Sequence, residues 1–227
     1  MDRILRGERG WQDLLADALR RAPRPIPVDA RFLTRVVATR SGLPPRFDRG
    51  TMPPAREAST LLLLYPADDG ALTLPLTVRH AALRAHAGEV SLPGGAAESA
   101  DEDRAATALR EAREEIGVDP AAVSVIGALD DVWIPVTNFD IRPFVAVAAE
   151  RPRLVPQTDE VALILELPVA DLLADGAISE ELVQGPPGIT LRVGGYRTQG
   201  QVIWGATART LAMLATVLRG APSGPGS

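Results

Sequence analysis

A loop-and-helix segment, residues 92–118, constrains the fold more than any other part of the chain. It begins with a Pro-Gly-Gly turn whose backbone can approach a ligand closely. An alanine-rich periodicity follows and predicts a helix whose small side chains let it lie close against a sheet. Ser99 with Glu102, or alternatively Asp101, is expected to cap the start of this helix. Gly117 is expected to end it in a left-handed conformation.

Three acidic residues share one face of this predicted helix. Glu111, Glu114 and Glu115 have the spacing i, i+3 and i+4, so their side chains fall within one narrow arc. Each like-charge pair at this spacing opposes helix formation by roughly 0.2–0.5 kcal/mol, and the helix dipole disfavours anions near the C-terminus. One interpretation of these residues is a solvated acidic surface with Arg110 and Arg113 as ion-pair partners. A second interpretation is a binding site for a hard dication, and the glycines on both sides of the helix favour this one.

The same segment resembles the Nudix box, whose pattern is G-x5-E-x7-R-E-U-x-E-E-x-G-U with U an aliphatic residue. Residues 110–118 match its second half without a gap. In the first half the position of the opening glycine falls on Ala96, and Gly95 lies one residue further away. A loop that is longer by one residue is typical of the coenzyme A pyrophosphatase branch of the family.

A second signature of that branch, L-T-x-R-x6-H-x-G-x-V-x-F-P-G-G, resembles residues 76–95. Two positions depart from it: His80 stands where a small residue is expected, and Leu92 replaces the usual phenylalanine. Neither departure affects a residue that the resemblance assigns to a metal. The resemblance covers roughly residues 59–219.

The resemblance implies a divalent metal site with Mg²⁺ or Mn²⁺ as the cofactor. Its ligands would be Glu111, Glu114 and Glu115, together with the main-chain carbonyl of Gly95. Glu114 and Glu115 are also candidates for the catalytic base. Arg110 would orient a glutamate through paired hydrogen bonds, and the alternative for Arg110 is a surface ion pair with Glu114.

The resemblance also implies residues outside the acidic face. Glu160 is a candidate base, and its alternative is a surface position at a strand edge. Arg79, Arg84, His86 and Gly94 are candidate substrate-binding residues, because coenzyme A carries a 3′-phosphate as well as a pyrophosphate. The alternative for His86 is a structural hydrogen bond that holds the loop.

The predicted function is therefore cleavage of the pyrophosphate bond of coenzyme A, or of its derivatives, to 3′,5′-ADP and 4′-phosphopantetheine or its acylated form. Two alternatives stay open. The chain could hydrolyse another nucleoside diphosphate derivative such as NADH or ADP-ribose, or it could be a catalytically inactive module that binds a nucleotide and regulates a partner. A homodimer is a family-level expectation.

The remaining patterns predict an α/β fold, in which a mixed sheet lies between helices as an α/β/α sandwich. Strands are expected at 61–65, 72–78, 123–129, 141–148, 161–165, 189–193 and 201–204, with helices at 11–21, 29–40, 171–174 and 207–219. Residues 1–57 are expected to form a helical N-terminal extension with a proline-rich linker, residues 58–220 the main domain, and residues 221–227 a disordered tail.

Composition excludes several other classes of function. The chain has no cysteine and no lysine, which excludes disulfides, thiolate zinc sites, Schiff-base chemistry and a Walker-type phosphate loop. Its net charge is -5, and the sequence contains no basic stripe of the kind that binds nucleic acid. No segment has the length and apolar character of a membrane span, and the first residues do not resemble a signal peptide. These features predict a soluble, cytoplasmic protein.

Overall fold

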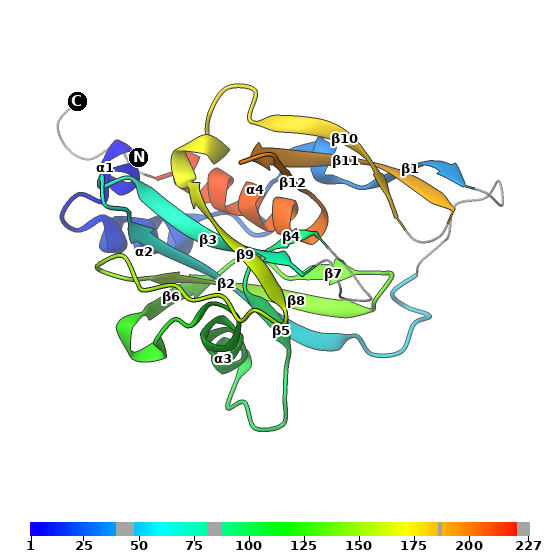
Figure 1. Ribbon diagram of the computed structural model, residues 1–227. Coiled ribbons are helices and arrows are strands. Elements are labelled where there is room, and N and C mark those ends of the chain that lie inside the picture. The colour runs from blue at the N-terminus through cyan, green and yellow to red at the C-terminus, as the bar shows by residue number, and fades with distance from the viewer. Residues whose placement is uncertain (40–47, 81–87, 186–187, 222–227) are drawn as a thin grey trace.

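The computed structural model describes residues 1–39, 48–80, 88–185 and 188–221, which form two sheets with helices on both sides of the larger one (Figure 1). The larger sheet has eight strands in the order β4-β3-β2-β8-β6, with β5 also on β2, β7 on β8 and β9 on β3. The smaller sheet has the order β1-β11-β10, with β12 also on β11. The strands are β1 (Arg35–Thr39), β2 (Arg56–Pro66), β3 (Leu72–Arg79), β4 (Val90–Ser91), β5 (Gly94–Ala96), β6 (Ser124–Ala128), β7 (Val132–Ile134), β8 (Phe139–Val147), β9 (Val161–Pro168), β10 (Ile178–Gln184), β11 (Ile189–Thr198) and β12 (Gln201–Ile203).

Strand β2 is the centre of the larger sheet. It runs parallel to β8 and antiparallel to β3 and β5, so the sheet is mixed, as predicted. The apolar run from Leu61 to Tyr65 is fully buried, because both faces of the sheet are covered at this point. Among the described strands, β9 alone pairs with Pro75 of β3, and β2 reaches β3 only at Leu72 and Thr73. Proline has no backbone N–H to donate, and at Pro75 no second neighbouring strand in the described part of the sheet requires that hydrogen bond.

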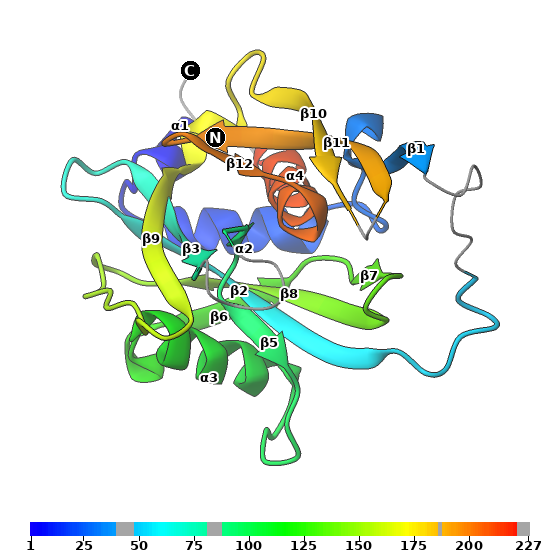
Figure 2. The ribbon, with the colours of Figure 1, turned by 45° about the vertical axis from the view of Figure 1, so that its right-hand side comes forward.

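The larger sheet separates two hydrophobic clusters. One face packs against α3 (Arg104–Ile116) through the small side chains Ala108 and Ala112. The other face packs against α2 (Trp11–Arg21) and α4 (Gly205–Arg219), and the smaller sheet lies beyond α4 (Figure 2). The predicted α/β class with a mixed sheet between helices is confirmed. The smaller sheet adds a further layer that the sequence did not predict.

The N-terminal helices belong to the main hydrophobic cluster. Helix α1 (Asp2–Leu5) contributes Ile4, and α2 contributes Trp11 and Leu15, all at most 2% exposed. The predicted helix at 11–21 is confirmed. These side chains contact the same cluster as the larger sheet and α4.

The predicted helix at 29–40 is wrong. Asp29 does cap a turn, since its carboxylate accepts a hydrogen bond from the Arg31 N–H at 2.9 Å, but the turn is only the 3-10 helix η1 (Ala30–Phe32). The chain then extends as β1 and pairs with β11. The β-branched residues of β1 favour a strand once a partner is present, and that partner lies about 150 positions later in the sequence.

Shorter elements differ from prediction mainly at their ends. The helix expected at 171–174 is the 3-10 helix η3 (Val169–Leu172), and another short 3-10 helix, η2 (Pro120–Ala122), precedes β6. Strand β10 was not predicted. Residues 222–227, expected to be a disordered tail, lie outside the described residues. Within the described ranges, no helix is both long and apolar enough to cross a membrane.

Candidate active site

Helix α3 begins and ends at residues with clear local causes. Asp103 is the N-cap, and its carboxylate accepts hydrogen bonds from the N–H groups of Ala105 and Ala106, both at 2.8 Å. The predicted caps, Ser99 with Glu102 or Asp101, are therefore wrong, since they lie too early to reach the first free N–H groups. Gly117 ends the helix with φ 71°, as predicted.

The glycine turn forms β5 and lies against β2. Gly94 pairs with Thr60 and Gly95 with Ser59. A Cβ atom at Gly94 would lie 2.7 Å from the Thr60 Cα, and one at Gly95 would lie 2.6 Å from the Glu111 carboxyl carbon. Only glycine therefore lets this backbone approach both the central strand and the acidic face of α3.

Glu115 is buried, with 5% of its surface exposed. Its Oε2 accepts a hydrogen bond from the Gly94 N–H at 3.1 Å. Burial raises the pKa of Glu115 to about 7, in spite of that hydrogen bond; the charges of Glu111 and Glu160 raise the pKa further, and the charge of Arg79 lowers it. Glu111, Glu160 and Arg79 thus lie within electrostatic range of Glu115.

Arg110 joins the acidic face to the preceding loop. Its Nη1 donates to Glu111 Oε1 at 2.9 Å and to Glu114 Oε2 at 3.1 Å. Its Nε donates to Asp101 Oδ1 at 3.0 Å, and its Nη2 donates to the Ala96 carbonyl at 3.0 Å. The contact with Glu111 and the i+4 ion pair with Glu114 thus occur together in one side chain.

Asp101 is a residue of this site that the sequence reasoning considered only as a cap. Its side chain is 7% exposed and binds both Arg110 and the Thr107 hydroxyl, the latter at 2.8 Å. The hydrogen bonds from Arg110 hold the pKa of Asp101 well below its usual range. Asp101 and Arg110 are nine positions apart, and no helical or strand period connects them. The local sequence therefore carried no signal for this pair.

Strands β3 and β9 place two further predicted residues beside α3. Arg79, the last residue of β3, pairs with Val161 of β9, and the Glu160 carbonyl accepts from the His80 N–H at 2.8 Å. Burial raises the pKa of Glu111, and the charges of Glu114 and Glu160 add to that effect. Within the described residues, the buried Nε of Arg79 has no hydrogen-bond partner. Arg84 and His86 lie outside the described residues.

The donor set suits a hard cation in its chemistry. Carboxylates meet at the turn with two of their pKa values raised, and a nearby cation would relieve both their mutual repulsion and their burial. The absence of a side chain at Gly95 leaves its backbone open toward Glu111. In the described ranges, however, no three histidine or acidic side chains already form a cluster that holds a metal ion, and Arg110 contacts two of the carboxylates.

Comparison with known proteins identifies the family. Residues 55–183 match the NUDIX domain. The chain is 38% identical over 168 residues to Nudix hydrolase 22, chloroplastic, of Arabidopsis thaliana, which covers 72% of this chain and 55% of that protein. It is 35% identical over 196 residues to the uncharacterized Nudix hydrolase NudL of Cronobacter sakazakii, which covers 84% and 94%. The chain spans 55% and 58% of the length of the two Arabidopsis relatives.

Solved structures give a more distant likeness. The crystal structure of a Nudix hydrolase from M. smegmatis, RenU, is 24% identical and has a TM-score of 0.44, covering 60% of this chain and 81% of that one. The family match spans more than half of the chain. The chain therefore belongs to the Nudix family.

Proposed function

We propose that this protein hydrolyses the diphosphate bond of coenzyme A or its derivatives, to give 3′,5′-ADP and 4′-phosphopantetheine or its acylated form. One observation carries the proposal: the backbone of Gly94 and Gly95 lies directly against Glu111 and Glu115 of α3. This contact joins the end of the upstream signature, residues 76–95, to the acidic face of the box. The upstream signature is the feature that favours coenzyme A over other nucleoside diphosphates.

Glu111, Glu114 and Glu115, with the carbonyl of Gly95, are the proposed ligands of Mg²⁺ or Mn²⁺. To bind a cation, Glu111 and Glu114 must share their oxygens with it or turn away from Arg110, which now donates to both. When bound, a dication supplies charge neutralisation at the diphosphate and acidifies a water molecule.

Arg110 is proposed as a positioning residue, because it is itself held by Asp101 and the Ala96 carbonyl. It orients the carboxylates of α3 before the cation arrives. Its side chain is 22% exposed, so these ion pairs are only partly screened by solvent. Positioning of this kind, together with electrostatics, accounts for most catalysis in phosphoryl transfer.

Hydrolysis needs a base and a counter-charge. Glu160 is the proposed base outside the box, with Glu114 or Glu115 as the alternative. The base takes a proton from water as the water oxygen bonds to phosphorus and the bridging P–O bond breaks. Arg79, whose buried Nε has no hydrogen-bond partner in the described part of the chain, and the Gly94 backbone are proposed to contact the diphosphate. Arg84 and His86 are proposed to bind the substrate from the adjoining segment.

The test is to incubate the purified protein with coenzyme A, NADH and ADP-ribose, each with Mg²⁺ or Mn²⁺, and to separate the products by chromatography. We expect 3′,5′-ADP from coenzyme A only in the presence of metal, with loss of the product in Glu115→Gln. Glu150→Gln, a change at an exposed glutamate outside the box, is the control. Better cleavage of NADH or ADP-ribose would contradict the substrate assignment. Nucleotide binding without cleavage would favour a regulatory module. A cytoplasmic homodimer stays a family-level prediction.

A further inference from the structure

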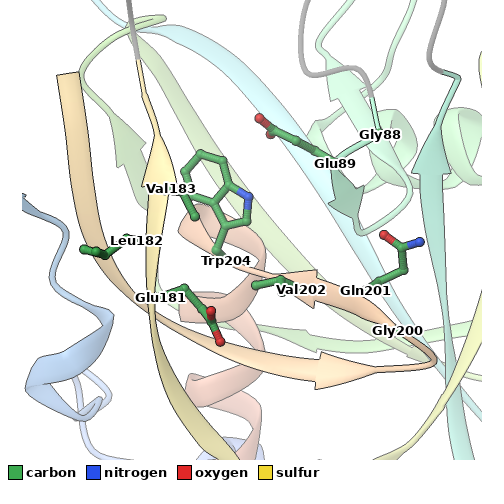
Figure 3. A pocket seen from close by; sticks show the side chains of 9 residues that line it. All are labelled: Gly88, Glu89, Glu181, Leu182, Val183, Gly200, Gln201, Val202 and Trp204. Carbon is green, nitrogen blue, oxygen red and sulfur yellow. The ribbon is translucent and has the colours of Figure 1, made fainter. Parts of the chain in front are cut away.

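A cavity of about 330 Å³ lies between the smaller sheet and the turn that leads into β4 (Figure 3). Strand β10, the β11–β12 turn, the residue before α4 and the turn at Gly88 and Glu89 form its walls. Its volume lies at the lower end of the range of about 300–1,000 Å³ that is typical of small-molecule sites. Nothing in the proposed chemistry of the acidic face uses it.

One wall of the cavity is aromatic and aliphatic. Trp204 is the N-cap residue of α4 and is only partly buried. Its indole stands beside Val183 at the centre of the cavity, and Val202 lies below it (Figure 3). A partly exposed indole with aliphatic neighbours offers a flat apolar surface to a ligand, at little cost in conformational entropy.

The charged groups of the cavity are carboxylates, and Gln201 adds a side-chain amide. Glu89 and Glu181 bring carboxylates to it from opposite sides (Figure 3). Arg197 holds Glu181 through two hydrogen bonds, at 2.8 and 2.7 Å, and this pairing lowers the pKa of Glu181, so its carboxylate stays ionised. None of the described lining residues is basic. The cavity therefore suits an uncharged group that carries N–H donors and disfavours a phosphate.

The cavity also lies close to the candidate active site along the chain. The Glu89 carbonyl accepts from the Arg79 N–H at 3.0 Å, so the cavity wall and the proposed diphosphate contact are joined directly. Gly94 follows Glu89 by five residues, which span at most about 18 Å when extended. An extended arm of about that length, on a ligand held at the diphosphate site, would therefore reach the wall of the cavity that Glu89 forms.

We propose that this cavity binds the uncharged, amide-bearing arm of the substrate, the pantetheine portion of coenzyme A, against Trp204. The inference rests on the proposed function. The pantetheine arm has aliphatic methyl groups for the indole and two amide N–H groups for the carboxylates. The adenosine end carries a 3′-phosphate, for which the described walls of the cavity offer carboxylates and no counter-charge.

The first test uses pantetheine alone, because it has no phosphate and does not depend on hydrolysis. It is titrated into the full-length protein by isothermal titration calorimetry, a readout that does not depend on the tryptophan that is replaced. We expect saturable binding that is absent in Trp204→Leu and is weakened in Val183→Asp, which puts a charge in place of an aliphatic neighbour of the indole. Val37→Asp is the matched control, since Val37 is 46% exposed on β1 of the same sheet and does not line the cavity.

The second test uses steady-state kinetics with coenzyme A and metal. We expect Val183→Asp to raise KM about tenfold or more, equivalent to about 1.4 kcal/mol, with kcat nearly unchanged. Inhibition by 4′-phosphopantetheine should weaken in parallel, and inhibition by 3′,5′-ADP should not. Circular dichroism of each variant separates these effects from unfolding.

The outcomes distinguish the two proposals. If coenzyme A is not cleaved but pantetheine binding requires Trp204, the proposed function fails and the cavity assignment holds. If coenzyme A is cleaved with the same KM by the wild type and by folded Val183→Asp, the cavity assignment is overturned and the function stands. Loss of 3′,5′-ADP inhibition in place of phosphopantetheine inhibition would also overturn it, because the cavity would then hold the adenosine end.

Discussion

Replacing Glu115 by glutamine is expected to stabilise the metal-free protein above pH 7 while abolishing hydrolysis. Glu115 is 5% exposed, and burial raises its pKa from 4.5 to about 7. From the described residues its carboxylate accepts one hydrogen bond, that of the Gly94 N–H. A glutamine amide oxygen can accept the same bond without carrying a charge into the protein interior.

The size of the effect follows from linkage. A group whose pKa is higher in the folded state adds stability that is fully present below its unfolded pKa and is lost as the pH rises through its folded pKa. For Glu115 this window runs from 4.5 to about 7. A shift of about 2.5 units, at about 1.36 kcal/mol per unit, gives roughly 3 kcal/mol. Glutamine is neutral throughout, so its advantage over glutamate should grow by about that amount across the window.

The assay is urea unfolding in a chelator at several pH values from 4.5 to 8.5. The quantity compared is the difference in unfolding free energy between Glu115→Gln and the wild type, in which shifts common to both proteins cancel. Glu114→Gln is the control, since that side chain is on the same helix and is 58% exposed. A difference for Glu115→Gln that stays constant across the range would refute the reasoning. Saturating Mn²⁺ should reverse the order, because only the wild type gains the full binding energy of the metal.

Gly95→Ala should lower kcat/KM by about ten- to a hundredfold, because the added Cβ would displace the Glu111 carboxylate. Unchanged activity in a folded variant would contradict the close approach of the Gly95 backbone to Glu111. Arg110→Lys keeps the positive charge but loses the branched contacts to Asp101, Ala96 and the glutamates. We therefore expect weaker Mn²⁺ binding, measured by calorimetry. Binding equal to that of the wild type would argue against a positioning role for Arg110. Trp11→Ala should lower the free energy of unfolding in urea by about 3–5 kcal/mol, because Trp11 is 2% exposed within the main hydrophobic cluster. A change below about 1 kcal/mol would mean that α2 packs only loosely.

Local signals predicted the part of the site that local structure determines. The turn with Gly94 and Gly95, the helix with its acidic face and the left-handed Gly117 all lie within one segment, and each depends on neighbours a few residues away. The buried run from Leu61 to Tyr65 was also predicted, because both faces of its strand are covered and nearly every residue is apolar.

Long-range pairing was beyond the reach of the same signals. Strand β1 was predicted as a helix because its partner β11 is distant in sequence. The pairing of β3 with β9 brings Arg79 next to Val161 and so places Glu160 beside α3, an arrangement that no period in either segment encodes. The contact between Asp101 and Arg110 is of the same kind, since it depends on how a loop folds back over a helix.

The small side chains beneath α3 have a consequence for how this protein tolerates mutation. Ala108 and Ala112 are completely buried where the helix meets the sheet. A larger residue at either position must lift the helix, and the carboxylates of Glu111 and Glu115 would move with it, away from the Gly94 backbone. Larger residues at these two positions are therefore expected to reduce hydrolytic activity more than thermal stability, although neither alanine lies on the acidic face.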